Sequence, residues 1–350
     1  MDMVFDGHND VLLRLWRERQ EGGNPLQDFI KGTSAGHIDA PRAKRGGLAG
    51  GLCAIYIPSP HDFSLKEPDA DGHYTTPLDP PLDRHSSLDI ALGMAALAHQ
   101  LEQAGGWRLC RSTAEIRAAM AEGVFAAVLH MEGCEAIDAD LDALDVFYAA
   151  GLRSLGPVWS RNNIFGHGVP FAYPSSPDTG PGLTDAGAAL VKACNRLGIL
   201  IDLAHITEKG FWDVARISDQ PLIASHSNVH ALTPVARNLT DHQLDAIRES
   251  RGLVGLNYAV TMLRADGRDN PDTPLSDMVR HLDRLVERVG IDCVALGSDF
   301  DGATIPNAIA DAAGNQRLIS ALRDHGYDQD ALDKICRENW LRVLASAWHE

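Results

Sequence analysis

The sequence has no long apolar run, no paired cysteines and little positive charge. No apolar run approaches the ~18 residues that a transmembrane helix requires. The six cysteines form no C-x-x-C pair, so they indicate neither a zinc knuckle nor a disulfide framework. The formal net charge is −17, whereas a phosphate backbone attracts Lys and Arg. We therefore expect no membrane and no nucleic acid among the partners.

Signs of targeting are also missing. The segment MDMVFDGHND at the start contains neither the basic part nor the apolar part of a secretory signal. Scattered cysteines are typical of a reducing compartment. These features predict a cytoplasmic protein. They leave the oligomeric state open, with a homodimer as one alternative.

What the chain does have is an alternation of short apolar runs and longer amphipathic stretches. Eight runs resemble buried strands, at 4–10, 48–57, 124–133, 152–159, 198–205, 221–226, 252–258 and 293–300. Helical patterns lie at 88–104, 138–150, 184–196, 207–218, 241–250, 275–289, 314–324 and 328–348.

This order predicts an α/β protein with one domain over residues 1–350. The fold would be a (β/α)8 TIM barrel with long βα-loops and a C-terminal helical extension. The long loops are expected at 58–87 and 160–183, which are rich in Pro, Asp and Gly. A doubly wound sheet is the rival fold, but no G-x-G-x-x-G follows a strand.

The expected strands end in residues that bind metals. Because active sites of such barrels lie at the carboxyl ends of the strands, these residues should meet. His8 and Asp10 are two apart, so both point to the same side of a strand. Imidazoles and carboxylates together suit Zn²⁺ or a similar divalent ion. The set comprises His8, Asp10, Glu132, His205, His226 and Asp299.

Each motif has an ordinary explanation when taken alone. HND can be a turn or a helix cap, a buried His can be a core residue, and GSDFDG can be an Asp-Gly turn. Six such coincidences on one edge of a barrel are rare, so the set predicts a metal site. Glu132 has two oxygens and can bridge two ions. None of the six lysines ends an expected strand, so a carboxylated lysine is not expected as the bridge.

In this order the motifs resemble the membrane (renal) dipeptidase family of the amidohydrolase superfamily. The resemblance extends from residue 6 to about residue 345. It rests on DGHND at 6–10, HMEG at 130–133, DLAH at 202–205, SHS at 225–227, ARN at 236–238 and GSDFDG at 297–302. By this resemblance, His8, Asp10 and Glu132 hold one metal ion. Glu132, His205 and His226 hold the other.

The resemblance also implies a reaction. A hydroxide bridging two ions, with zinc as the favoured metal, would attack the peptide bond of a dipeptide. Asp299 matches the acid/base aspartate, beside Glu132 at the catalytic centre, and Arg237 matches the arginine that binds the substrate carboxylate. Family members often accept a D-residue at the C-terminal position.

The chain departs from the family in one place. Many members have a histidine after the fourth strand that polarises the scissile carbonyl, and Trp159 stands at that position. His167, in the loop that follows, is the candidate substitute in the substrate site, although it can equally be an exposed loop residue. His130 is expected in the core or behind the ligands.

Two other functions stay open on the sequence. One is a hydrolase of lactones or cyclic amides, although those enzymes more often begin with H-x-H and use a lysine bridge. The other is a non-catalytic barrel that binds metal or peptide. The presence of both Asp299 and Arg237 favours the dipeptidase.

Overall fold

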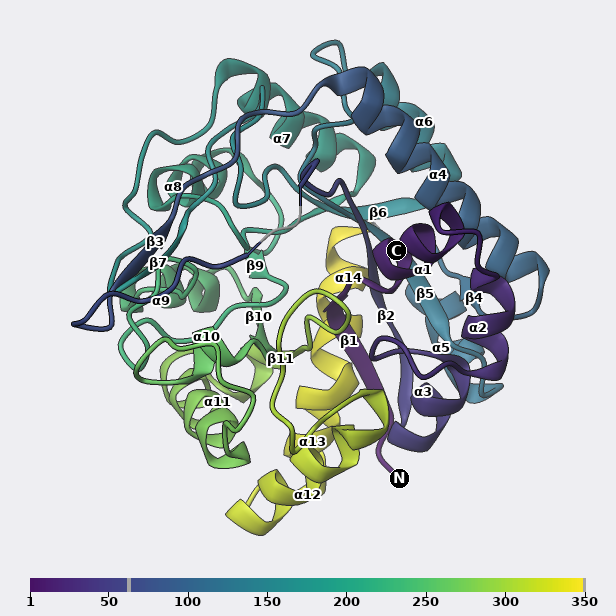
Figure 1. Cartoon of the computed structure of the whole chain (residues 1–350), viewed down its shortest axis with the longest axis vertical. Helices are drawn as coiled ribbons and strands as arrows, with labels where there is room; N and C mark the ends of the chain where they lie inside the picture. Colours follow the sequence, from purple (N-terminus) through teal and green to yellow (C-terminus); the bar gives the residue numbers. More distant parts are fainter. Residues whose placement is uncertain (62–63, 349–350) are drawn as a thin grey trace.

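Parallel strands surrounded by helices form the body of the protein (Figure 1). The structure is a computed structural model that describes residues 1–61 and 64–348. One sheet has the order β1-β2-β5-β6-β8 and a second has the order β11-β10-β9, all in parallel pairs. Single bridges join the two sheets at Asp202–Ile223 and at Asn9–Phe300. The strands therefore form a curled parallel arrangement like that of a TIM barrel.

All eight expected strands are present, although two are short. Their bounds are β1 Val4–Asn9, β2 Leu48–Tyr56, β5 Ala126–Glu132, β6 Leu152–Gly156, β8 Leu200–Ile201, β9 Ile223–Ala224, β10 Leu253–Asn257 and β11 Val294–Gly297. A further short strand, β4 (Arg108–Leu109), pairs with the beginning of β5.

Helices lie in all the regions where the sequence predicts them. These are α4 Arg84–Gln103, α6 Asp142–Ala150, α7 Asp185–Leu197, α8 Glu208–Ile217, α9 Asp241–Glu249, α11 Leu275–Val289, α12 Asn315–His325, α13 Gln329–Asp333 and α14 Asn339–Ala347. A π-helical turn, Lys334–Glu338, separates the last two. The structure adds α1 Val11–Gln20, α2 Pro25–Lys31, α3 Ala40–Gly46, α5 Thr113–Ala121 and α10 Val260–Leu263.

Threonine caps explain where three helices begin. The hydroxyls of Thr184, Thr207 and Thr240 accept the backbone N–H three residues later, at the first turns of α7, α8 and α9. Such caps satisfy a helix donor that has no partner within the helix. They fix the point at which each strand-end loop turns into a helix.

The two long segments contain a small sheet of their own. Strand β3 (Tyr74–Thr76) pairs antiparallel with β7 (Phe171–Tyr173). The expected loop at 58–87 thus holds a strand and the first turn of α4, and its residues 62–63 lie outside the described residues. The pairing ties the two long segments together at one side of the molecule (Figure 1).

An apolar cluster fills the space between the strands below their carboxyl ends. Strand residues such as Phe5, Leu52 and Val128 are fully buried against Trp340 and Leu344 of α14. In Figure 1, α14 lies close to the centre of the ring of strands. Burial of so much apolar surface stabilises the scaffold. Because this cluster fills the space below them, only the carboxyl ends of the strands are left to hold a functional site.

Gly7 shows how closely α14 approaches the strands. A Cβ at this position would lie 2.3 Å from the Trp340 ring and 2.6 Å from the carbonyl oxygen of Ser225. The indole of Trp340 is held by a hydrogen bond to the carbonyl of Leu296 at 2.9 Å. A larger residue at position 7 would therefore force β1, which carries His8, apart from Trp340 and from the backbone at Ser225.

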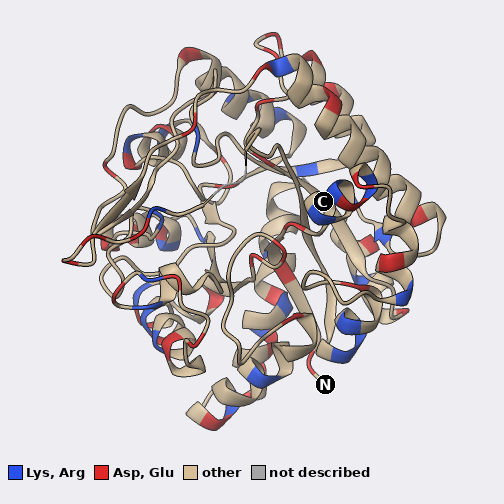
Figure 2. Cartoon of the chain, in the orientation of Figure 1, with Lys and Arg blue, Asp and Glu red and all other residues tan. Residues whose placement is uncertain are grey.

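Charged residues lie mainly around the outside, with acidic and basic side chains interspersed (Figure 2). Acidic residues outnumber basic ones by 48 to 31. Among the described residues, no helix has the length and hydropathy needed to cross a membrane.

Candidate metal centre

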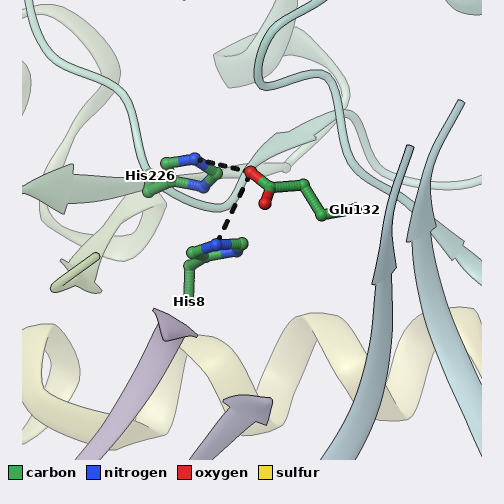
Figure 3. A group of neighbouring side chains, drawn as sticks. All are labelled: His8, Glu132 and His226. Atoms are coloured by element: carbon green, nitrogen blue, oxygen red, sulfur yellow. Dashed lines mark ion pairs between the residues drawn. The ribbon is translucent and has the colours of Figure 1, made fainter. Parts of the chain in front are cut away.

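Three imidazoles converge on one oxygen of Glu132. The Oε1 atom lies 3.0 Å from Nε2 of His205, 3.4 Å from Nε2 of His226 and 3.6 Å from Nε2 of His8. Figure 3 shows the carboxylate of Glu132 beside the rings of His8 and His226, with one oxygen paired to both. Each residue lies at or just beyond the carboxyl end of its strand, as the sequence predicts.

Two more carboxylates lie beside His8. Its Nε2 is 3.4 Å from Oδ2 of Asp10. Ligand atoms of His8, Asp10 and Asp299 lie within 4.8 Å of one another, and so do those of His8, Glu132 and His226. The structure thus brings together the six residues of metal-binding type that the sequence singles out.

Strained backbone marks two of these positions. His205 has φ 67° and Asp299 has φ 58°, both in the left-handed region. Non-glycine residues rarely adopt this conformation, which costs of order 1–3 kcal/mol. The cost is typical of sites where side-chain direction matters more than stability.

The electrostatics of the group favour a cation. Burial lowers the pKa of His8, but the charges of Glu132 and Asp10 outweigh this effect and raise it to about 10. Burial and the neighbouring carboxylates Asp10 and Asp299 raise the pKa of Glu132 well above its usual value. Both shifts mean that the site gains stability from added positive charge.

The donor set fits a divalent metal ion. Burial lowers the pKa values of His205 and His226 far below the usual range, which keeps both rings neutral. Their Nε2 atoms nevertheless lie only 3.0 Å apart. Both ring nitrogens of His8 and Oδ1 of Asp10 are buried without a hydrogen-bond partner. A cation among these atoms would take one ring nitrogen of His8 and Oδ1 of Asp10 as ligands, since neutral imidazole and carboxylate are zinc ligands.

Arg237 lies against the same group. Its Nη2 donates to the carbonyl of His226 at 3.3 Å, and its Nε is buried without a partner. Burial lowers the pKa of Arg237 to about 10, against the attraction of Asp299 and Glu132. A guanidinium held in place with a donor to spare can bind an anionic ligand.

Trp159 and His167 occupy different surroundings. The Trp159 ring lies 5.7 Å from the ring of His205 and 5.1 Å from that of Tyr56, with ring planes tilted. His167 is half-buried, and one of its ring nitrogens, Nδ1, bonds to the carbonyl oxygen of Gly182 at 2.9 Å. Within the described chain, no hydrogen bond or ion pair joins His167 to the six-residue group. Its role as a substitute for the family histidine stays a prediction.

Asn257 is a site residue that the sequence reasoning missed. It ends β10, and its Nδ2 donates to Oδ2 of Asp299 at 3.0 Å. Burial raises the pKa of Asp299, and the hydrogen bond from Asn257 partly offsets this effect. The strand at 252–258 was predicted, and a search of its last residues for any polar group would have found Asn257.

Fold and site together define a parallel α/β protein with a metal-binding centre at the carboxyl ends of its strands. The model of the membrane dipeptidase family (peptidase family M19) matches residues 2–349. The chain belongs to this family, a family of metallo-dipeptidases.

Solved structures and sequence relatives agree with this assignment. A metallo peptidase from Rhodobacter sphaeroides, liganded with a phosphinate mimic of the dipeptide L-Ala-D-Ala, is 52% identical over 99% of both chains, with a TM-score of 0.95. The dipeptidase AC, a metallo peptidase of family M19, is also 52% identical with a TM-score of 0.95, over 100% of this chain and 99% of its own. An uncharacterized protein in the pqqA 5' region of Klebsiella pneumoniae is 51% identical over 75% of this chain and 98% of its own.

Proposed function

We propose that the protein is a binuclear zinc dipeptidase whose substrates include dipeptides with a D-residue at the C-terminal position. One ion would be held by His8, Asp10 and Glu132, and the other by Glu132, His205 and His226. The observation that carries the proposal is the convergence of three Nε2 atoms on one oxygen of Glu132, at 3.0 to 3.6 Å. The L-Ala-D-Ala mimic bound to the Rhodobacter sphaeroides relative supports the substrate class.

Bound divalent ions would lower the pKa of water and polarise the scissile carbonyl. Asp299 would accept the proton of the attacking water and return it to the departing amine. Its raised pKa suits this exchange, since a carboxyl that holds a proton more tightly can also act as the acid. The hydrogen bond from Asn257 to Oδ2 leaves Oδ1 of Asp299 for the proton.

Arg237 would fix the substrate carboxylate. Its guanidinium is anchored on the carbonyl oxygen of His226, one of the proposed metal ligands. The substrate carboxylate would therefore be held close to the ions. A dipeptide bound in this way would place its only peptide bond over the ions. Arg237 would therefore select substrates whose scissile bond lies next to a free C-terminal carboxylate.

The finer architecture belongs to the same proposal. We take the two parallel sheets as one closed (β/α)8 barrel in a single domain over residues 1–350. The bridges between Asp202 and Ile223 and between Asn9 and Phe300 support this closure. The cytoplasm is the proposed location, and its support is that all six cysteines are buried thiols.

The experiment is an assay of the purified protein on a panel of substrates, before and after removal of metal with a chelator. L-Ala-D-Ala and L-Ala-L-Ala should be hydrolysed, while a dipeptide amide, a tripeptide, a lactone and a cyclic amide should not. Activity should vanish with the metal and return with zinc. Faster turnover of the lactone or the cyclic amide would overturn the proposal, and so would inactivity of the zinc-loaded protein on the whole panel.

A further inference from the structure

Behind His226, two hydrogen bonds lead to a buried carboxylate. The Oγ of Ser225 lies 2.7 Å from Nδ1 of His226 and 2.5 Å from Oδ2 of Asp202. Oδ1 of Asp202 accepts the backbone N–H of Ser225 at 2.7 Å. All three residues are no more than 1% exposed. The motifs DLAH and SHS meet here, and the proposed function uses neither Asp202 nor Ser225.

The direction of these hydrogen bonds follows from their chemistry. A carboxylate has no proton to donate, and a hydroxyl has only one. The Oγ of Ser225 therefore donates to Asp202 and accepts the N–H of His226 at Nδ1. With its proton on Nδ1, a neutral imidazole carries its lone pair on Nε2. That nitrogen is the one 3.4 Å from Oε1 of Glu132.

We propose that Asp202, acting through the hydroxyl of Ser225, is the positioning carboxylate of His226. The pair fixes the tautomer and the ring direction so that Nε2 faces a metal ion. The inference rests on the proposed metal site. Groups that hold the second nitrogen of a metal-binding histidine typically contribute 10–100-fold to metal affinity.

A second Asp–Ser pair shows what is particular about this one. Asp6 of β1 accepts the backbone N–H and the hydroxyl of Ser298, each at 2.7 Å, and so joins β1 to the end of β11. The hydroxyl of Ser298 also lies 3.3 Å from the carbonyl oxygen of His8, not from its ring. The pairing alone can therefore tie strands together. The hydroxyl of Ser160 also lies 2.8 Å from Nδ1 of a proposed ligand, His205. Within the described residues, Ser225 is the one serine that connects such an imidazole to an aspartate.

Ser154 provides a matched control. Its hydroxyl lies 3.0 Å from Nδ1 of His130, which is not a proposed ligand, and both residues are fully buried. Ser154→Ala thus removes one buried hydroxyl from one buried imidazole, whereas Ser225→Ala also removes the hydrogen bond to Asp202. Because Nε2 of His130 lies 3.6 Å from Oδ2 of Asp202, the control measures the loss of a buried hydroxyl near the same carboxylate.

The test is zinc binding, measured by competition with a chromophoric chelator on the purified metal-free proteins. Ser225→Ala and Asp202→Asn should each weaken one of the two bound ions about 10–100-fold and leave the other within about threefold. The double variant should lose little more than either single variant, because both changes break one connection. Ser154→Ala should bind both ions as the wild type does, and so should Ser225→Thr, which keeps the hydroxyl.

Equal losses in Ser225→Ala and Ser154→Ala would overturn the inference, and so would wild-type zinc affinity in Ser225→Ala. If Ser225→Ala does not fold, a measurement on the wild-type protein tests the inference instead. In zinc-loaded protein labelled with 15N-histidine, the Nδ1 proton of His226 should give a slowly exchanging, hydrogen-bonded signal, and a rapidly exchanging one would contradict the assignment. Failure of the proposed function is distinguishable, because the wild type would then bind no zinc or cleave no dipeptide.

Discussion

Among single residues, Arg237 would connect the proposed metal site to the substrate. Replacing it by methionine removes a charge-assisted contact, so we expect kcat/KM for L-Ala-D-Ala to fall about 10–100-fold. The dipeptide amide, which has no carboxylate, should be an equally poor substrate for both proteins. Arg216→Met is the control, because that side chain is 67% exposed on α8. An unchanged preference for the free acid over the amide in Arg237→Met would contradict the role of Arg237.

His167 and Trp159 are the two candidates for polarising the carbonyl oxygen. If the imidazole of His167 is the donor, His167→Ala should lower kcat about 10²–10³-fold while both metals stay bound. Its Nδ1 is held by Gly182, so Nε2 is the nitrogen that would face the substrate.

Trp159→Phe is the matched variant, because it removes the indole N–H and keeps an aromatic ring beside His205. Kinetics and metal content should be measured on both variants. If His167→Ala stays within about threefold of the wild type, the prediction for His167 is wrong. A large loss of kcat in Trp159→Phe alone would assign the donor to the indole.

Among the elements, α11 positions the loop that carries Arg237. Nδ1 of His281 on α11 accepts the backbone N–H of Val229, and its Nε2 lies 3.1 Å from the carbonyl oxygen of Leu263. Burial lowers the pKa of His281 to about 4, from an ordinary value of 6.5. The neutral ring fits this position, because a protonated ring could not accept from Val229.

A lowered pKa gives stability that is complete above pH 6.5 and is lost as the pH falls toward 4. Urea unfolding of the metal-free protein should show this loss, which amounts to about 3 kcal/mol for His281. His281→Asn should lose less stability than the wild type over the same pH range. His85→Asn is the control, since that side chain is 82% exposed. Parallel pH profiles of wild type and His281→Asn would contradict the prediction.

The elements differ in how well the sequence predicts them. Strands such as β5 and β10 were predictable because continuous apolar runs are typical of strands buried on both faces. Helix α2 was not, because seven residues are too few for a periodic pattern. Strands β3 and β7 have three residues each and exist through their mutual pairing, which depends on tertiary structure.

The site follows the same division. The grouping of the proposed ligands His8 and Glu132 was predictable, because both are residues of metal-binding type at the ends of strands. Ser225 and Asn257 are not of a metal-binding residue type, so the sequence alone did not single them out. Their importance comes from partners on neighbouring strands, Asp202 and Asp299, and local sequence does not contain strand order.

For the whole molecule, the number of metal ions is the main prediction. Carefully prepared protein should contain near two zinc equivalents per chain. If Glu132 bridges the two ions, Glu132→Gln should weaken the binding of both, whereas Asp10→Asn should weaken the binding of one. Metal analysis and chelator titration measure both effects. If the wild type reproducibly contains a single ion, Glu132 does not bridge two ions. The same conclusion would follow if Glu132→Gln lost only one of two ions.

Metal should also stabilise the folded chain. Ligands that bind only the folded state add about 2.7 kcal/mol at a concentration 100-fold above Kd. Removing zinc should therefore lower the melting temperature, and adding it back should restore it. Asp10→Asn should show a smaller zinc-dependent shift than the wild type, because one ion of two is weakened. An unchanged melting temperature after complete metal removal would contradict a structural contribution from the ions.

The contact between β1 and the end of β11 joins segments that lie almost 300 residues apart. Asp10 donates its backbone N–H to Phe300 at 2.8 Å, and Asp299 donates to His8 at 3.0 Å. On a ribosome, His8 and Asp10 therefore emerge long before the strand that completes their surroundings. Nascent chains that lack β11 should bind zinc weakly and cleave nothing, so the cell would meet an active peptidase only once synthesis has passed residue 300.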